Sequence, residues 1–258
     1  MSYSAFARFY DQLTGNISYP QRAAYFDRLL RRHGVGEGAI LLDLACGTGS
    51  LSLELAALGY DVIGVDGSPA MLSEAMEKRW EAGREDVLFL CQDMTELDLY
   101  GTIHAAVCAL DSLNHITDPA ALEEAIGRVS LFMEQGGVFA FDVNTPYKHE
   151  TVLGNNTFVY DCDSVYCVWQ NSYHPEDRTV EISLDFFEQE EDEDGCYRRS
   201  SESFCERAYP LEELQGMLER CGMALEACYH EDSFDPPRAD TQRWVCVARK
   251  TSPTGKIR

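Results

Sequence analysis

This 258-residue sequence lacks the common signatures of a metal site and of a secreted protein. Its ten cysteines form no CxxC pair, and the closest two, Cys162 and Cys167, are five residues apart. We therefore expect no metal site. No basic segment followed by an apolar core comes after Met1, so we expect a cytoplasmic protein whose cysteines are free thiols.

Positive charge is also scarce, because 21 Lys and Arg stand against 44 Asp and Glu, which gives a formal net charge of −23. Nucleic acids and anionic membranes attract proteins mainly through Lys and Arg. No run of about 18 apolar residues is present either. We therefore expect a small-molecule substrate, with no nucleic acid and no membrane as partner. The composition does not decide between a monomer and a homodimer.

Two nucleotide-binding signatures are incomplete. A dinucleotide-binding loop reads GxGxxG, and the segment that begins at Gly47 and Gly49 has Ser52 in place of the third glycine. The Gly-Lys-Ser/Thr sequence of a P-loop does not occur. These absences argue against a nicotinamide dehydrogenase and against a P-loop enzyme.

Up to about residue 145, short apolar runs alternate with helical patterns. Apolar runs bounded by glycine or polar residues are typical of buried parallel strands. Repeated strand–helix units predict an α/β fold with helices on both faces of a parallel sheet. The predicted strands are Ile40–Leu44, Asp61–Val65, Val87–Cys91, Ala105–Ala109 and Gly137–Asp142, and the predicted helices are Pro20–Arg32, Ser50–Leu58, Pro69–Trp80 and Pro119–Met133.

After Pro146, strand patterns follow one another without helices between them, which predicts an antiparallel insertion. A helix and two strands then complete the first sheet. We expect a core of residues 1–145 and 208–250, an insertion of residues 146–207 and a tail of residues 251–258. The predicted elements are strands Thr157–Tyr160, Val165–Tyr173, Thr179–Gln189 and Tyr197–Arg207, turns at 174–177 and 192–195, helix Leu211–Cys221, and strands Ala224–Tyr229 and Arg243–Arg249.

A glycine-rich turn connects the first predicted strand to the next helix, around Gly47 and Gly49. Glycines allow a tight turn and a close approach of the backbone to a ligand. The amides at the start of the helix favour an anionic ligand group there. The alternative is a turn that only connects the two elements.

Two acids follow the next two predicted strands. Asp66 ends the second strand, about 20 residues after the glycine turn, where a carboxylate can accept hydrogen bonds from ribose hydroxyls. Asp93 follows the third strand and could accept a hydrogen bond from an adenine amine. Each could instead be an ordinary turn or capping residue. Because the loops at the carboxyl ends of parallel strands surround one crevice, we expect a nucleoside site there.

The segments Asp43–Gly49, Asp66–Leu72 and Gln92–Met94 resemble the motifs of class I S-adenosylmethionine-dependent methyltransferases. The likeness extends to Phe6–Asp11 and Asp111–Asn114, and the whole chain is similar to small bacterial methyltransferases of the YqeM type. The resemblance implies a Rossmann-like seven-stranded methyltransferase sheet with an inserted antiparallel β lid. It also implies S-adenosyl-L-methionine as methyl donor and S-adenosyl-L-homocysteine as product.

The resemblance further implies a set of cofactor-binding residues. The glycine turn would line the methionine part, Asp66 would hold the ribose, and Asp93 and Met94 would lie at the adenine. Tyr10 would close over the cofactor, although an aromatic that packs on the core is the alternative. The full set is Tyr10, Asp43, Ala45, Gly47, Gly49, Asp66, Gly67, Met71, Asp93, Met94 and Leu110.

Methyl transfer from a sulfonium is an in-line displacement, so alignment of the acceptor does most of the catalytic work. A general base is needed only if the acceptor arrives protonated. Asp111 and His115 are the candidate catalytic residues, although a structural role for His115 is the alternative. The residues expected to contact the acceptor are Asn114, Asp142, Asn144 and Trp169.

The leading hypothesis is a methyltransferase that acts on a small molecule. Two alternatives stay open: a protein that binds the cofactor or its product without catalysis, and a methyltransferase that acts on a protein or tRNA. The acid excess argues against tRNA. Within the small-molecule hypothesis, Phe132 stands where one similar amino-sugar enzyme has a histidine, which argues against that acceptor in particular.

Overall fold

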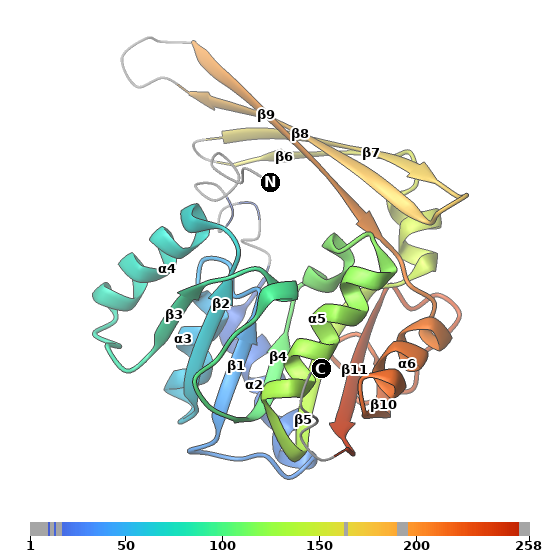
Figure 1. The fold of residues 1–258 in the computed structure, drawn as a ribbon. Coiled ribbons are helices and arrows are strands. Elements are labelled where there is room, and N and C mark those ends of the chain that lie inside the picture. Colours follow the sequence, from blue (N-terminus) through green and yellow to red (C-terminus); the bar gives the residue numbers. More distant parts are fainter. Residues whose placement is uncertain (1–9, 11–12, 14–16, 163–164, 190–195, 253–258) are drawn as a thin grey trace.

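The computed structural model describes residues 10, 13, 17–162, 165–189 and 196–252, which form two β-sheets with helices around the larger one (Figure 1). The larger sheet has seven strands in the order β10-β11-β5-β4-β1-β2-β3. Its strands are β1 Ile40–Leu44, β2 Asp61–Asp66, β3 Leu88–Cys91, β4 Ile103–Cys108, β5 Met133–Asn144, β10 Met223–His230 and β11 Arg243–Lys250. The predicted seven-stranded α/β sheet is confirmed.

Strand directions bring the functional loops to one edge of this sheet. The strands β1 to β5 pair in parallel, and β11 is antiparallel to both β5 and β10. The loops that follow β1, β2, β3 and β4 therefore meet at the same edge, as is usual for ligand sites in open α/β sheets.

Helices cover both faces, and the apolar residues explain why. On one face, α5 (Pro119–Phe132) and α6 (Leu211–Arg220) pack on the sheet through residues such as Ile126 and Met217. On the other face, α2 (Tyr19–Arg32) and α3 (Ser50–Ala57) pack through residues such as Phe26 and Leu55. A further helix, α4 (Pro69–Glu81), contacts β2 and β3. It is capped by Ser68, whose Oγ accepts a hydrogen bond from the amide of Met71.

Predicted and observed element ends agree within one or two residues except at β5. The strand was predicted over Gly137–Asp142 and spans Met133–Asn144. Its last residues stay in the ladder because Asp142 and Asn144 pair with Val245 and Arg243 of β11. Asp142, the predicted last residue of this strand, and Asn144 are therefore both part of the sheet. Short helical turns follow β3, β4 and β5, namely η1 Met94–Glu96, η2 Ser112–His115 and η3 Lys148–Leu153.

The second sheet is inserted between β5 and α6 and lies above the carboxyl edge of the first (Figure 1). Its antiparallel strands, in the order β6-β7-β8-β9, are β6 Thr157–Asp161, β7 Val165–His174, β8 Thr179–Gln189 and β9 Tyr197–Arg207. The predicted turn at 174–177 is confirmed by the pair His174 and Thr179. The turn predicted at 192–195 lies outside the described residues.

The inner face of the second sheet packs down onto the first. Phe186, Phe204 and Ile182 share one hydrophobic cluster with Met71 of α4, and Tyr10 packs against the same cluster. The second sheet thus packs on the start of α4, which follows β2, and β9 contacts η2, which follows β4. Among the described residues, no helix is both long and apolar enough to span a bilayer.

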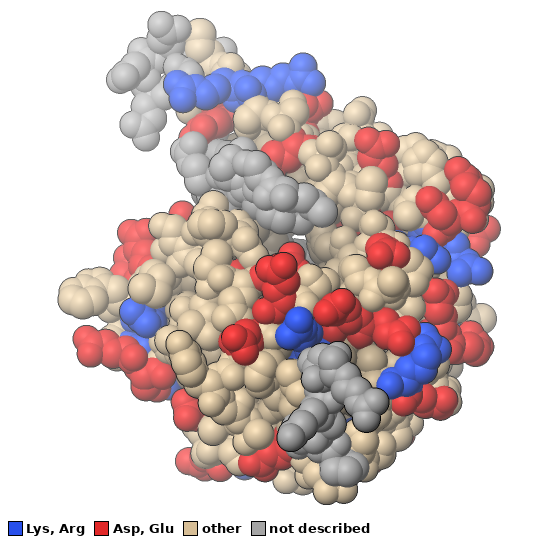
Figure 2. Space-filling view, viewed as in Figure 1, with Lys and Arg blue, Asp and Glu red and all other residues tan. Residues whose placement is uncertain are grey.

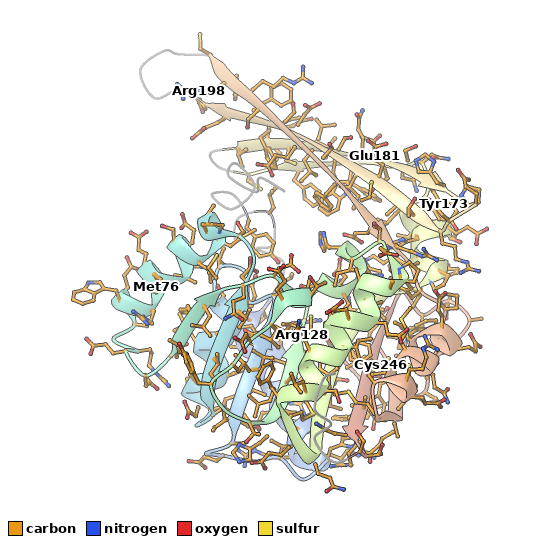
Figure 3. The ribbon with its side chains drawn as sticks, viewed as in Figure 1. Met76, Arg128, Tyr173, Glu181, Arg198 and Cys246 are labelled. Carbon is orange, nitrogen blue, oxygen red and sulfur yellow. The ribbon has the colours of Figure 1, made fainter. Side chains whose placement is uncertain are left out.

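The surface is acidic, as the composition predicts. In the face shown in Figure 2, carboxylates outnumber cationic side chains, and a basic stripe lies near the tip of the second sheet. Arg198, labelled in Figure 3, lies on β9 near that tip. All ten cysteines are free thiols.

Candidate active site

A pocket of about 270 Å³ lies at the carboxyl edge of the first sheet. It is lined by one turn from each of the first four strands together with Tyr10. The lining residues are Tyr10, Ala45, Gly47, Asp66, Gly67, Ser68, Met71, Asp93, Met94, Leu110, Ser112, His115 and Ile116. Nine of the eleven residues that the sequence analysis names as cofactor-binding are in this group. Ser68, Ser112 and Ile116 were not foreseen, although each stands beside a motif residue.

The turn after β1 is built from left-handed backbone. Ala45 and Gly47 have φ of 59° and 54°. A side chain at Gly47 would meet no atom within 4 Å, because the space above it belongs to the pocket. The backbone therefore forms the pocket wall here, and glycine both permits the turn and leaves room for a ligand.

Gly49 has a different role from the one expected. It does not line the pocket, and its φ of 74° forms the N-cap of α3. A Cβ at Gly49 would lie 2.8 Å from the Cβ of Ala75 and 2.8 Å from the ring of Phe89. The glycine is required because α4 and β3 pack directly against this turn.

Asp66 organises two of the pocket loops. Its Oδ2 accepts a hydrogen bond of 2.9 Å from the amide of Gly47, and its Oδ1 accepts one of 2.8 Å from the amide of Ser68. Burial raises the pKa of this carboxyl above its ordinary value, and the two amides oppose the rise. Each oxygen has a second lone pair that can accept from a ligand hydroxyl.

Asp93 and Asp43 occupy unlike environments. The exposed Asp93 accepts hydrogen bonds from the amide and the hydroxyl of Thr95, while it lines the pocket beside Met94. Asp43 is 1 % exposed and accepts a hydrogen bond of 2.5 Å from Ser52. Burial raises the pKa of Asp43 to about 7. Asp43 lines a small hollow that adjoins the pocket and also contains Tyr10 and Gly47.

The turn after β4 holds two consecutive residues in left-handed backbone. Leu110 and Asp111 have φ of 59° and 54°, which costs non-glycine residues roughly 1–2 kcal/mol each. Their amides donate to the two carboxylate oxygens of Asp142, at 3.0 and 2.7 Å. Asp142 thus compensates the unfavourable turn and presents Leu110 to the pocket.

Contact between Asp142 and the acceptor was expected, and the structure corrects this. Asp142 is fully buried, and its carboxylate forms ion pairs with Arg22 of α2 and Arg243 of β11. Burial raises the pKa of Asp142, but these two guanidinium groups hold it below its ordinary value. All of its acceptor capacity is directed at protein groups, because β5 is a central strand that β11 covers.

Asn114 and Asn144 are also turned away from the pocket. Asn114 is fully buried, donates to the carbonyls of Asn144 and Arg207 and accepts from the amide of Asn144. Asn144, 2 % exposed, donates to Asp111 and to Glu206. Both residues join the ends of β4, β5 and β9, and neither lines the pocket.

Trp169 lies in the second sheet and packs there. Its indole N–H donates to Asn171 at 2.9 Å, and its ring lies 6.1 Å from that of Tyr160. It belongs to the cluster beneath the second sheet and does not line the pocket. The alternation of the strand, which places it on the packed face, could have indicated this.

The two candidate catalytic residues differ in their access to the pocket. His115 and its neighbour Ser112 line it. Asp111 pairs with Arg243 at 2.6 Å, and its side chain is 19 % exposed. Burial raises the pKa of Asp111, but Arg243, Lys148 and His115 lower it well below its ordinary value. Its cationic neighbours therefore hold Asp111 as an anion, and of the two candidates only His115 lines the pocket.

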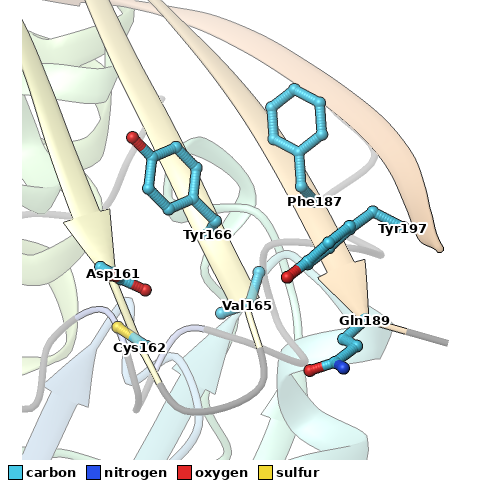
Figure 4. Close-up of a pocket in the computed structure, with 7 residues that line it drawn as sticks. All are labelled: Asp161, Cys162, Val165, Tyr166, Phe187, Gln189 and Tyr197. Atoms are coloured by element: carbon cyan, nitrogen blue, oxygen red, sulfur yellow. The ribbon is translucent and has the colours of Figure 1, made fainter. Parts of the chain in front are cut away.

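A second hollow, of about 470 Å³, lies among side chains of the second sheet (Figure 4). Its rings, Tyr166, Phe187 and Tyr197, come from β7, β8 and β9, with Asp161 at the end of β6. The loops at the carboxyl edge of the first sheet contribute nothing to it. Among the described residues, no group of three or more His, Cys, Asp and Glu is arranged to hold a metal ion.

Known proteins share both the sequence and the fold. Residues 41–137 match the family model of a methyltransferase domain. The chain is 31% identical to YqeM of Bacillus subtilis, named as a methyltransferase, over 97% of this chain and 98% of that protein. It is 31% identical to a glycine/sarcosine N-methyltransferase of Parasynechococcus marenigrum, over 46% of this chain and 41% of that enzyme.

Among solved structures, an S-adenosylmethionine-dependent methyltransferase of Clostridium acetobutylicum superposes with a TM-score of 0.86. It is 30% identical, and the match covers 97% of this chain and 99% of that one. The likeness therefore includes the second sheet as well as the first. The chain belongs to the class I S-adenosylmethionine-dependent methyltransferases, in the group that contains YqeM.

Proposed function

We propose that this methyltransferase transfers the methyl group to a nitrogen of a small-molecule amine held between the first-sheet pocket and the second sheet. The observation that carries the proposal is the cluster in which Met71 and Tyr10, both at the pocket, pack with Phe204 and Phe186 of the second sheet. A sheet anchored in this way acts as a lid, and the space beneath it suits a small acceptor better than a folded macromolecule.

The pocket residues suit S-adenosylmethionine, which supplies a methyl group on a positively charged sulfur. In our proposal Asp66 accepts from the ribose hydroxyls, and Gly67 and Met71 lie at the adenosine. Asp93 and Met94 take the adenine, and the apolar Ile116 adds to the walls of the same pocket. The left-handed turn at Ala45 and Gly47, and Leu110 opposite, border the methionine part, with Tyr10 above them.

The charge and the relatives both favour an amine. Acids outnumber bases 44 to 21, which favours a cationic acceptor over an anionic one. The glycine/sarcosine enzyme acts on amino nitrogens by name, and about 46% of this chain aligns with it. Residues 146–207 would cover such an acceptor and exclude water during transfer.

A direct test is methyl transfer from radiolabelled S-adenosylmethionine to separate panels: small amines such as glycine, sarcosine and ethanolamine, bulk tRNA, and protein extract. We expect label in at least one small amine. Label in tRNA or protein alone would contradict the small-molecule acceptor. Tight binding of S-adenosylhomocysteine with no transfer to any panel would favour the alternative of a non-catalytic binding protein.

A further inference from the structure

Glu206 is a buried carboxylate that no sequence motif marks. It stands next to the end of β9, in the second sheet, and is 3 % exposed. Its side chain points toward the first sheet, where its Oε1 lies 3.7 Å from Nε2 of His115. Since His115 lines the pocket, an acid of the second sheet stands directly behind a candidate base of the first.

Polar and basic side chains surround the carboxylate of Glu206. Its Oε2 lies 3.4 Å from Nε2 of His149, and it accepts a hydrogen bond of 3.1 Å from Asn144. Lys148 donates to the other end of that amide at 2.8 Å. A buried carboxylate is costly unless positive charge and hydrogen bonds surround it. Two histidines on opposite sides can supply this charge.

His149 supports the placement of Glu206. It is fully buried, and neither ring nitrogen has a hydrogen-bond partner among the described residues. Its Nε2 approaches Oε2 of Glu206, so the carboxylate lies between a buried histidine and a pocket histidine. Asp66, at the end of β2, and Asp111 are also near His115, and both interact with it electrostatically.

Side-chain hydrogen bonds on both sides of His115 fix its position relative to Glu206. Asn114, just before His115, donates to the carbonyl of Arg207 at 2.8 Å. Tyr209 donates through its hydroxyl to the carbonyl of Ile116, just after His115. The ring of Phe204 lies 5.0 Å from the imidazole. The end of β9 is thus bonded to the η2 turn on both sides of the histidine.

We propose that Glu206 is a positioning residue of the second sheet that orients His115 and stabilises its protonated form, so that His115 accepts a proton from an amine. This inference rests on the proposed function. The acceptor nitrogen forms the new N–C bond with its lone pair, while the electron pair of the S–C bond returns to sulfur. One N–H proton passes to His115, whose positive charge Glu206 balances, and later leaves to water.

The primary test needs no acceptor. The full chain, labelled with ¹⁵N in its histidines, is bound to S-adenosylhomocysteine, and the ring-nitrogen shifts of His115 are assigned with a His115→Asn variant. Hydrogen bonds at catalytic sites often shorten when a ligand binds. We therefore expect the wild type to carry a hydrogen-bonded proton on Nε2 of His115, and Glu206→Met to show a mixture of tautomers.

The control is Glu181→Met, at an exposed position on β8 of the same sheet (Figure 3), which should leave the His115 signals unchanged. Wild-type protein in which Nε2 of His115 bears no bonded proton would overturn the proposal, even if Glu206→Met does not fold. Identical His115 signals in folded wild type and folded Glu206→Met would overturn it as well.

Kinetics separate this proposal from the proposed function. With the amine found in the panels, Glu206→Gln should lose about tenfold or more in kcat with the KM for S-adenosylmethionine unchanged, as part of the roughly 10²–10⁴-fold effect of a general base. Unchanged kcat would contradict the positioning role. The His115 signature in a protein that methylates no amine would instead contradict the proposed acceptor class, because the spectra are recorded without one.

Discussion

The two sides of the pocket are built in different ways. On the side of β1, β2 and β3, the contacts are local: Asp66 bonds to amides 19 residues before it and two after it. On the side of β4, β5 and β9, they join distant segments: Arg22 and Asp142 are 120 residues apart, and Asp142 and Arg243 are 101 apart. The first side has backbone amides and glycines, and the second has buried ion pairs.

This difference explains why a short sequence motif can encode the first side of the pocket and not the second. A nucleoside is the same in every member of the family, and a short motif can encode its site. The acceptor side depends on charges that meet only after the chain has folded, so its stability and its chemistry are coupled. Mutations of pocket-lining residues on the first side should therefore weaken binding, whereas mutations of the buried ion pairs on the second side should impair folding.

The largest expected effect is on folding, at Asp142. Asp142→Ala leaves Arg22 and Arg243 buried beside no carboxylate and leaves two amides of a left-handed turn unpaired. We expect a loss of about 3–5 kcal/mol in the free energy of unfolding, measured by urea denaturation. The matched control is Glu123→Ala, which breaks an exposed ion pair with Arg220 and should cost less than about 1 kcal/mol. Equal losses would contradict the account.

The next effect separates two glycines of one turn. Gly49→Ala adds a Cβ that meets Ala75 and Phe89 and has an unfavourable φ, so we expect a loss of about 2–4 kcal/mol in unfolding free energy. Gly47→Ala meets nothing in the protein, and only the backbone cost of about 1 kcal/mol applies. Cofactor binding, measured by titration calorimetry, should be weakened more by Gly47→Ala. The reverse order would show that the two roles are exchanged.

The smallest effect, taken per pH unit, is a pH dependence that comes from Asp43. Burial raises its pKa to about 7 in the folded protein, above about 3.9 in an unfolded chain. The folded state therefore binds the extra proton, and this contribution to stability is lost as the pH rises from about 4 through 7, by at most about 1.4 kcal/mol per pH unit. Asp43→Asn should remove that slope from the unfolding free energy. An unchanged slope would mean that Asp43 is ionised in the fold.

The local side is also the side that the sequence predicted well. The motif residues Gly47, Asp66, Asp93 and Met94 line one pocket because the carboxyl ends of parallel strands meet at one edge, and the strand–helix repeats predict a parallel sheet. Gly49 was assigned to the cofactor, although it packs against α4, since a glycine pattern does not tell a ligand from a neighbouring helix.

The long-range side could not be predicted in the same way. Asp142 was placed at a strand end, but β5 continues and β11 covers it. Glu206 was not named at all, because nothing in its neighbourhood along the chain indicates that His115 and His149 will surround it. Contacts between residues about 100 positions apart leave no periodicity to read.

We expect the pocket at the carboxyl edge to bind S-adenosylmethionine through Asp66. Titration calorimetry with this ligand tests it most directly, on the wild type, on Asp66→Ala, and on Asp61→Ala as an exposed control at the start of the same strand. We predict that the wild type and Asp61→Ala bind alike and that Asp66→Ala binds roughly 10- to 100-fold more weakly, as the loss of charged hydrogen bonds implies. Equal binding by all three proteins, or none by folded wild type, would contradict the account.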